Sequence, residues 1–171
     1  RIVAKVENQR GMDNAGDIAA VADAIMVDRG DLSVETSLHD VALRQKSIIQ
    51  AAAKYGRPVI IATEMLHTMI DNSFPTKAEV SDITNAVLDG CAATMLSGET
   101  AIGNFPEEAV RLMRDVADAS ESHVQHELGT VPLDLGSSVP EVMGEVISEM
   151  CRALPVTKIV AITRSGFAAR M

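Results

Sequence analysis

Four short apolar runs, each followed by a polar turn and then a helical pattern, constrain the fold of this chain more than any other feature. The runs cover residues 2–7, 24–27, 59–63 and 92–96, and their ends lie about 20 to 36 residues apart, as in successive strand–helix units with right-handed crossovers. The third run is apolar almost without interruption, which is typical of a parallel strand covered on both faces. The pattern predicts half of an eight-stranded (β/α) barrel or most of a doubly wound sheet.

The segments between these runs carry helix signals. We expect helical structure over residues 15–22, 38–53, 64–70, 76–90 and 106–117, and a loop over residues 8–13. Ser37 is a candidate N-cap, Thr76 and Glu79 are spaced as a capping box, and Pro106 suits a first helical turn.

Polar residues follow all four apolar runs at the same end. They are Lys5 with Glu7, Asp31, Thr63, and Ser97 with Glu99. In a (β/α) barrel the carboxyl ends of the strands meet at one face, where the functional residues gather. This arrangement favours the barrel over the doubly wound sheet.

The periodic pattern ends after residue 121. We therefore assign residues 1–121 to the C-terminal half of the barrel, 122–137 to a connection, and 138–171 to the beginning of an α/β C-terminal domain. A capping box at Ser138 would open the first helix of that domain, and residues 158–163 would form its first strand. The chain starts within a strand and stops abruptly, so we expect it to be part of a longer polypeptide.

Composition narrows the function classes. The formal net charge of −9 argues against nucleic acid or anionic membrane as partners. Phosphorylated small molecules are still compatible with this charge, because an acidic protein can contain a local basic pocket. No apolar run approaches the ~18 residues of a membrane span. Cys91 and Cys151 lack metal-ligand spacing and predict buried free thiols in a reducing compartment, so we expect a cytoplasmic protein.

The candidate chemistry begins with Lys5 and Glu7. Residues two apart in a strand point the same way, so these two share a face, and a simple ion pair would explain them equally well. Asp31 adds a second carboxylate, unless it lies in a solvated loop. Two carboxylates and one ammonium at a pocket mouth suit a hard divalent cation, with Lys5 facing a phosphate or an enolate oxygen. Thr63 and Ser97 could relay a proton through water.

At these residues the sequence resembles the pyruvate kinase family. The matching segments, in order, are Lys5-Val6-Glu7-Asn8, Met26-Val27-Asp28-Arg29-Gly30-Asp31-Leu32, Ala62-Thr63-Glu64-Met65-Leu66, Pro75-Thr76-Lys77-Ala78-Glu79-Val80-Ser81-Asp82 and Met95-Leu96-Ser97-Gly98-Glu99-Thr100-Ala101. The resemblance covers nearly all of the chain. It implies the second half of that family's catalytic barrel followed by the opening of its C-terminal domain.

The resemblance also implies a reaction and its setting. The reaction would be phosphoryl transfer between phosphoenolpyruvate and ADP, giving pyruvate and ATP in glycolysis, with Mg²⁺ and usually K⁺, whose ligands would lie outside this chain. The whole enzyme would be a cytoplasmic homo-oligomer, a tetramer. The implied residues are Lys5, Thr63 and Ser97 as catalytic, Arg29 and Gly30 (through backbone), Asp31 and Thr63 as substrate-binding, and Glu7 and Asp31 as metal ligands.

The sequence differs from the family in two ways, and these limit how far the family's residue roles can be transferred to it. Many members have Ala where Asp28 stands and Gly where Ser33 stands, so an extra negative charge would lie close to the substrate carboxylate. The early barrel strands, with a phosphate-binding arginine, and the lid domain have no counterpart here, so we expect this chain alone to be inactive. Residues 163–166 resemble the start of an effector phosphate loop, although a plain strand-to-helix turn fits equally well.

Two other functions share these residues. A magnesium-dependent lyase or aldolase that acts through a pyruvate enolate would also need two carboxylates at barrel strand ends, but it would not need Lys5 two residues before Glu7. A non-catalytic, truncated half barrel would share every residue and differ only in its flanking sequence.

Overall fold

The structure is a computed structural model that describes residues 1–35, 37–124 and 139–162. The chain divides into two compact units, Arg1–Glu127 and Leu128–Met171, and each is described by itself.

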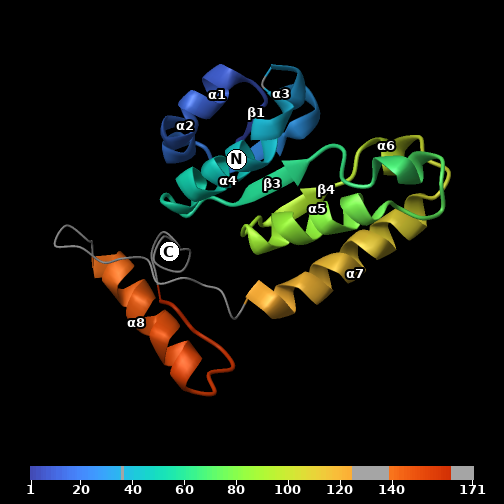
Figure 1. The fold of residues 1–171 in the computed structure, drawn as a ribbon. Coiled ribbons are helices and arrows are strands. Elements are labelled where there is room, and N and C mark those ends of the chain that lie inside the picture. Colours follow the sequence, from blue (N-terminus) through green and yellow to red (C-terminus); the bar gives the residue numbers. More distant parts are fainter. Residues whose placement is uncertain (36, 125–138, 163–171) are drawn as a thin grey trace. The chain divides into compact units, whose positions relative to one another are not determined.

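The first unit is built on a sheet of four parallel strands, β1 (Val3–Val6), β2 (Ala24–Asp28), β3 (Val59–Ala62) and β4 (Ala93–Met95) (Figure 1). The strand order is β1-β2-β3-β4, so every connection moves to the next strand in the same direction. Crossovers between parallel strands are generally right-handed, so a sheet whose strands follow in sequence order carries its connecting helices on one face, whereas a doubly wound sheet reverses its order and carries helices on both faces. The order confirms the prediction of part of a barrel.

Helices connect and cover these strands. In the first unit they are α1 (Gln9–Asp13), α2 (Ala15–Val21), α3 (Arg29–Glu35), η1 (Leu38–Asp40), α4 (Val41–Ala53), η2 (His67–Ile70), α5 (Lys77–Leu88), α6 (Gly98–Ala101) and α7 (Pro106–Val124). The predicted capping box is confirmed, because the Thr76 side chain accepts a hydrogen bond from Glu79 N while the Glu79 carboxylate accepts one from Thr76 N. Pro106 is the first residue of α7, as predicted.

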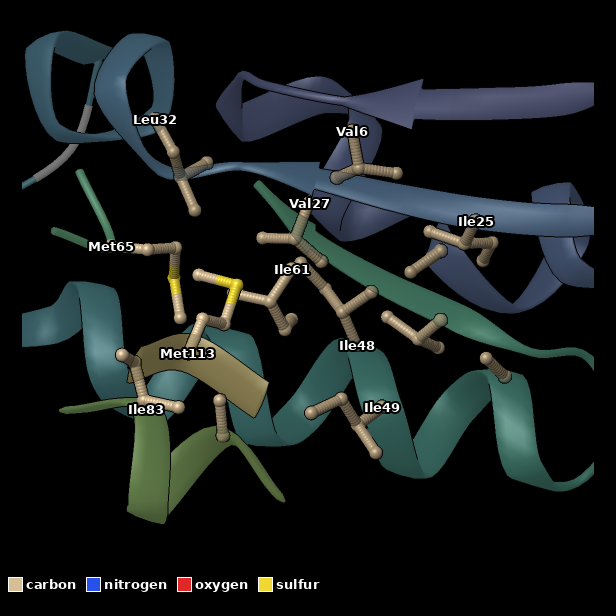
Figure 2. Packing of buried hydrophobic residues seen from close by; sticks show 14 of the residues in the cluster. Val6, Ile25, Val27, Leu32, Ile48, Ile49, Ile61, Met65, Ile83 and Met113 are labelled. Carbon is tan, nitrogen blue, oxygen red and sulfur yellow. The ribbon is translucent and has the colours of Figure 1, made fainter. Parts of the chain in front are cut away.

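The core lies between one face of the sheet and the helices. Val6 of β1, Val27 of β2 and Ile61 of β3 are fully buried and belong to the core, whereas Lys5 and Met26, next to Val6 and Val27 in their strands, are less buried and point to the other face. Figure 2 shows side chains of α4 meeting those of the strands within this layer. Strand alternation therefore decides which polar residues are kept out of the core.

Three local expectations were wrong. Residues 9–13 form α1 and not a loop, because the Asn8 side chain accepts a hydrogen bond from Gly11 N and caps the helix. The charged turn after β2 is the first turn of α3, which starts at Arg29 with no intervening loop. Ser37 does not cap the long helix: η1 comes between them, and α4 begins only at Val41.

The turn after α6 depends on a glycine. A Cβ added to Gly103 would lie 2.3 Å from the backbone oxygen of Glu99, a distance that only a backbone shift can relieve. We expect Gly103→Ala to lower the free energy of unfolding by about 1–3 kcal/mol, in the range of overpacking substitutions. Gly16→Ala in α2 is the matched control, because a Cβ there meets nothing within 4 Å and alanine favours the helix by up to ~1 kcal/mol. Equal urea midpoints for the two variants would contradict this prediction.

The second unit contains helix α8 (Val139–Ala153), which confirms the expected helix. The expected strand is wrong where it can be compared, since residues 158–162 have no strand structure. A strand exists only through hydrogen bonds to a neighbouring strand, and the described part of this unit offers none. Ser138 and residues 163–166 lie outside the described residues.

The boundary between the units remains a prediction in its details. Helix α7 continues through Val124, so residues 122–124, which the sequence assigned to the connection, are helical.

Of the helices that the structure describes, none combines the length and the apolar character needed to cross a bilayer.

Candidate active site

Lys5 lies among three carboxylates. Its Nζ is 2.6 Å from Glu7 Oε2, 2.8 Å from Asp28 Oδ2 and 3.1 Å from Asp31 Oδ2. An ammonium group has three N–H donors, so there is one donor for each carboxylate. Hydrogen bonds to Asp28, Glu7 and Asp31, in that order of size, raise the pKa of Lys5 well above its ordinary value of 10.5. Lys5 is therefore a cation throughout the physiological pH range.

The two neighbouring strands explain why these groups meet. Lys5 is in register with Met26 and Val6 with Val27, so continuing the pairing sets Glu7 opposite Asp28. Residues two apart share a face, which puts Lys5, Glu7 and Asp28 on the side of the sheet away from the core. Asp31 reaches the same place from the first turn of α3, directly after β2. The structure thus brings the predicted Lys5, Glu7 and Asp31 together.

Asp28 is the member that the sequence reasoning missed as a functional residue. Its side chain is only 11% exposed, and its Oδ1 accepts hydrogen bonds from Thr63 Oγ1 at 3.0 Å and from Asp31 N at 3.4 Å. Burial alone would raise the pKa of Asp28, but hydrogen bonds from Lys5, Thr63 and the Asp31 amide outweigh it and hold the pKa below its ordinary value. Its place opposite Glu7 follows from the register of β1 and β2, which only the structure supplies.

Thr63 adopts an unusual backbone conformation at the end of β3. Its φ is 69° and that of Glu64 is 54°, in the left-handed region that β-branched residues rarely adopt. Contacts with β2 and α3 hold this conformation: Gly30 N donates to Thr63 Oγ1 at 2.8 Å, and Arg29 Nη2 donates to Thr63 O at 2.9 Å. The same hydroxyl contacts Asp28, so Thr63 joins the cluster as predicted.

The Arg29 side chain does not take part in the cluster. It is 7% exposed, forms an ion pair with Asp82 and donates to the backbone oxygens of Thr63 and Glu64. These contacts tie the start of α3 to the end of β3 and to α5. Because these contacts occupy the Arg29 side chain, a substrate contact near Arg29 would have to use backbone amides.

Ser97 is separated from the cluster. It follows β4, which lies at the opposite edge of the sheet from β1, and it makes no hydrogen bond to the Lys5 group in the part of the chain that the structure describes. Glu99, 2% exposed, accepts hydrogen bonds from Ser97 N at 2.8 Å and Leu66 N at 3.0 Å. Glu99 therefore joins two loops at this end of the sheet.

The cluster fits a hard divalent cation. Glu7, Asp28 and Asp31 each offer a carboxylate oxygen, and these atoms lie within 4.8 Å of one another; Mg²⁺ favours such ligands. The side chains of Glu7 and Asp31 are 39% and 61% exposed and each contacts Lys5 through one oxygen, whereas Asp28 is 11% exposed with both oxygens hydrogen-bonded. Glu7 and Asp31 are therefore the more accessible of the three carboxylates, and their assignment as metal ligands stays a prediction.

Two hollows of the first unit are candidate binding sites. One of about 300 Å³ lies beside the cluster and is lined by Glu7, Asn8, Asp31, Val34 and Glu35. A larger one, about 520 Å³, lies along α5 and α7 and includes Val80, Leu88, Val116 and Ala119. The larger hollow contains no residue of the cluster, and a large volume does not by itself indicate a catalytic site. The smaller hollow is the better candidate because charged residues of the cluster line it.

Cys91 is not a candidate nucleophile. Cys91 and Cys151 are free, as predicted, although both are half-buried and not fully buried. Burial, aided by the negative charge of Asp89, raises the pKa of Cys91 to about 11. The reactive thiolate is therefore scarce near neutral pH.

Comparisons with known proteins point to one family. Residues 1–110 match the family model described as the barrel domain of pyruvate kinase. A pyruvate kinase from Bacillus licheniformis is 44% identical over 173 residues, covering 100% of this chain and 30% of the relative, and one from Borreliella burgdorferi is 54% identical over 123 residues, covering 72% of this chain and 26% of the relative. A crystal structure of a pyruvate kinase from Cryptosporidium parvum aligns with a TM-score of 0.86 at 37% identity, over 99% of this chain and 35% of that one. This chain spans about a third or less of the length of these proteins.

Proposed function

Since the chain belongs to the pyruvate kinase family, we propose that it supplies part of an active site for phosphoryl transfer between phosphoenolpyruvate and ADP, giving pyruvate and ATP. The observation that carries this proposal is the Lys5 ammonium held among carboxylates at the carboxyl ends of β1 and β2. A fixed cation beside ligands for a hard metal is what the transfer of a phosphoryl group needs, because catalysis of that step is mostly positioning and electrostatic stabilisation.

Lys5 stabilises the transferring phosphoryl group in this proposal. The charge on the group is spread over its equatorial oxygens in the transition state, and an ammonium aimed at them lowers its energy. The raised pKa of Lys5 keeps this charge in place at every pH at which the enzyme would work. Lys5 therefore acts as an electrostatic group and not as a proton donor.

Glu7 and Asp31 hold Mg²⁺ in the proposal. The ion, when bound, neutralises charge on substrate oxygens and orients them. Both ligands are accessible, and each still has a carboxylate oxygen beyond the one that contacts Lys5. We extend the proposal to K⁺ as a second cation with ligands outside this chain.

The remaining predicted residues act on the substrate and its proton. The backbone around Arg29 and Gly30, with Asp31, binds the substrate carboxylate, and Thr63 contacts the substrate from the end of β3. Ser97 belongs to the path that protonates the enolate and acts through water, because within the described residues it makes no hydrogen bond to the cluster.

The proposed setting follows the family. The whole protein would be a cytoplasmic glycolytic enzyme and a homo-oligomer, a tetramer, with no nucleic-acid or membrane partner. The formal net charge of −9 supports the absence of nucleic acid. The domain division into residues 1–121, 122–137 and 138–171 is proposed on the same basis.

A coupled assay tests the function. The whole protein, given phosphoenolpyruvate, ADP and Mg²⁺, should form pyruvate and ATP in equal amounts, and chelation of the metal should stop both. Pyruvate formation from oxaloacetate without ADP, together with no reaction of phosphoenolpyruvate, would favour the lyase and end the phosphotransferase proposal.

A further inference from the structure

We propose that Asp28 is a built-in counter-anion of this site, which competes with an anionic substrate for the hydrogen-bond donors of the site and so strengthens the dependence of substrate binding on a divalent cation. The inference rests on the proposed function. It concerns a specificity-determining residue whose two carboxylate oxygens accept hydrogen bonds from donors of the site.

The first argument is the set of donors that Asp28 occupies. Its Oδ2 accepts from Lys5 Nζ, and its Oδ1 accepts from Thr63 Oγ1 and Asp31 N. The Lys5 ammonium, the Thr63 hydroxyl and the backbone at the start of α3, which includes the Asp31 amide, are the groups assigned above to the substrate. An anion that enters the site must therefore compete with a carboxylate that already satisfies them.

The second argument is the burial of Asp28. Its side chain is 11% exposed, against 39% for Glu7 and 61% for Asp31. A charge that is shielded from water acts on its neighbours through a lower effective dielectric constant than an exposed charge does. Of the three carboxylates, Asp28 therefore repels an incoming anion with the least screening by water.

The third argument is the charge balance. Glu7, Asp28 and Asp31 surround one ammonium, so the cluster carries net negative charge while all three donors of Lys5 face carboxylates. Glu7 and Asp31 are exposed and fit a cation, whereas Asp28 has both oxygens engaged by the chain. A divalent cation beside the cluster offsets the charge that Asp28 adds, and this links cation binding to substrate binding.

Calorimetric titration of the whole protein with phosphoenolpyruvate, with and without saturating Mg²⁺, tests the inference. Without the cation, Asp28→Ala should bind phosphoenolpyruvate about tenfold more tightly than the wild type, as removal of one nearby like charge predicts. With Mg²⁺ the two proteins should differ less, so the gain in affinity from Mg²⁺ falls. A merely structural role would weaken binding under both conditions.

Asp28→Asn separates charge from shape, and it also serves if the alanine variant fails to fold. It keeps an acceptor at the same place but loses the charge, so its cation-free affinity should also exceed that of the wild type. Asp17→Ala, which removes an exposed carboxylate of α2, changes the net charge equally and should behave as wild type.

Two outcomes overturn the inference in distinguishable ways. If the wild type binds phosphoenolpyruvate with Mg²⁺ but neither Asp28 variant gains cation-free affinity, the competition does not exist while the proposed function stands. If the wild type fails to bind phosphoenolpyruvate with Mg²⁺ at all, the proposed function falls and this inference falls with it.

Discussion

Lys5→Met in the whole protein should abolish phosphoryl transfer to ADP while leaving proton exchange at the pyruvate methyl group at least partly intact. Methionine keeps an unbranched apolar stem but removes the ammonium that is held 2.6 to 3.1 Å from three carboxylates. Loss of one such electrostatic group at a transferring phosphoryl group costs about 10²–10³ in turnover or more. Proton exchange at the methyl group proceeds through an enolate, which needs the metal ion and a path for the proton. Lys5 is assigned neither to metal binding nor to the proton path.

Two assays on one preparation measure this split. The coupled assay reports phosphoryl transfer, and loss of deuterium from labelled pyruvate, followed by NMR, reports proton exchange. Lys54→Met, at the exposed end of α4, is the matched control and should leave both rates unchanged. An equal loss of both activities in Lys5→Met, with the fold intact by circular dichroism, would assign Lys5 to the enolate and contradict its role at the phosphate.

The fold could be predicted from the sequence where the signals are local. The apolar runs of residues 59–63 and 24–27 became β3 and β2, and the capping box at Thr76 became the start of α5. Each is decided by neighbours in the sequence, through alternation, capping and helix propensity. The strand predicted for residues 158–163 is wrong over the described residues 158–162, because a strand depends on a partner strand that no local pattern can supply.

The site was only half predictable for a similar reason. The convergence of Lys5 and Glu7 follows from alternation along one strand, and that of Asp31 follows from the short path out of β2. The ion pair between Lys5 and Asp28 depends on the register between β1 and β2, which the sequence alone does not give. The left-handed backbone of Thr63 depends on contacts with Arg29 and Gly30, which lie more than thirty residues away in the chain.

Glu7→Gln and Asp31→Asn in the whole protein should each lower turnover by orders of magnitude and raise the Mg²⁺ concentration needed for half-maximal activity, by about tenfold or more. Each change keeps the size of the side chain but removes a negative ligand from a hard cation. It also removes one of the carboxylates that surround Lys5, so the fold must be checked by thermal unfolding. Glu108→Gln, on the exposed surface of α7, removes an equal charge and should change neither quantity.

The metal titration decides between coordination and general electrostatics. If Glu7 and Asp31 bind the cation, extra Mg²⁺ should partly restore the rate of each variant, and Mn²⁺ binding measured directly by electron paramagnetic resonance should weaken in both. Asp28→Asn should weaken Mn²⁺ binding less, because both Asp28 oxygens already accept hydrogen bonds from the chain and its side chain is 11% exposed. Wild-type metal dependence in Glu7→Gln and Asp31→Asn would remove these two residues from the metal site. Equal weakening by all three variants would instead show that the cation responds to the summed negative charge of the cluster and not to individual ligands.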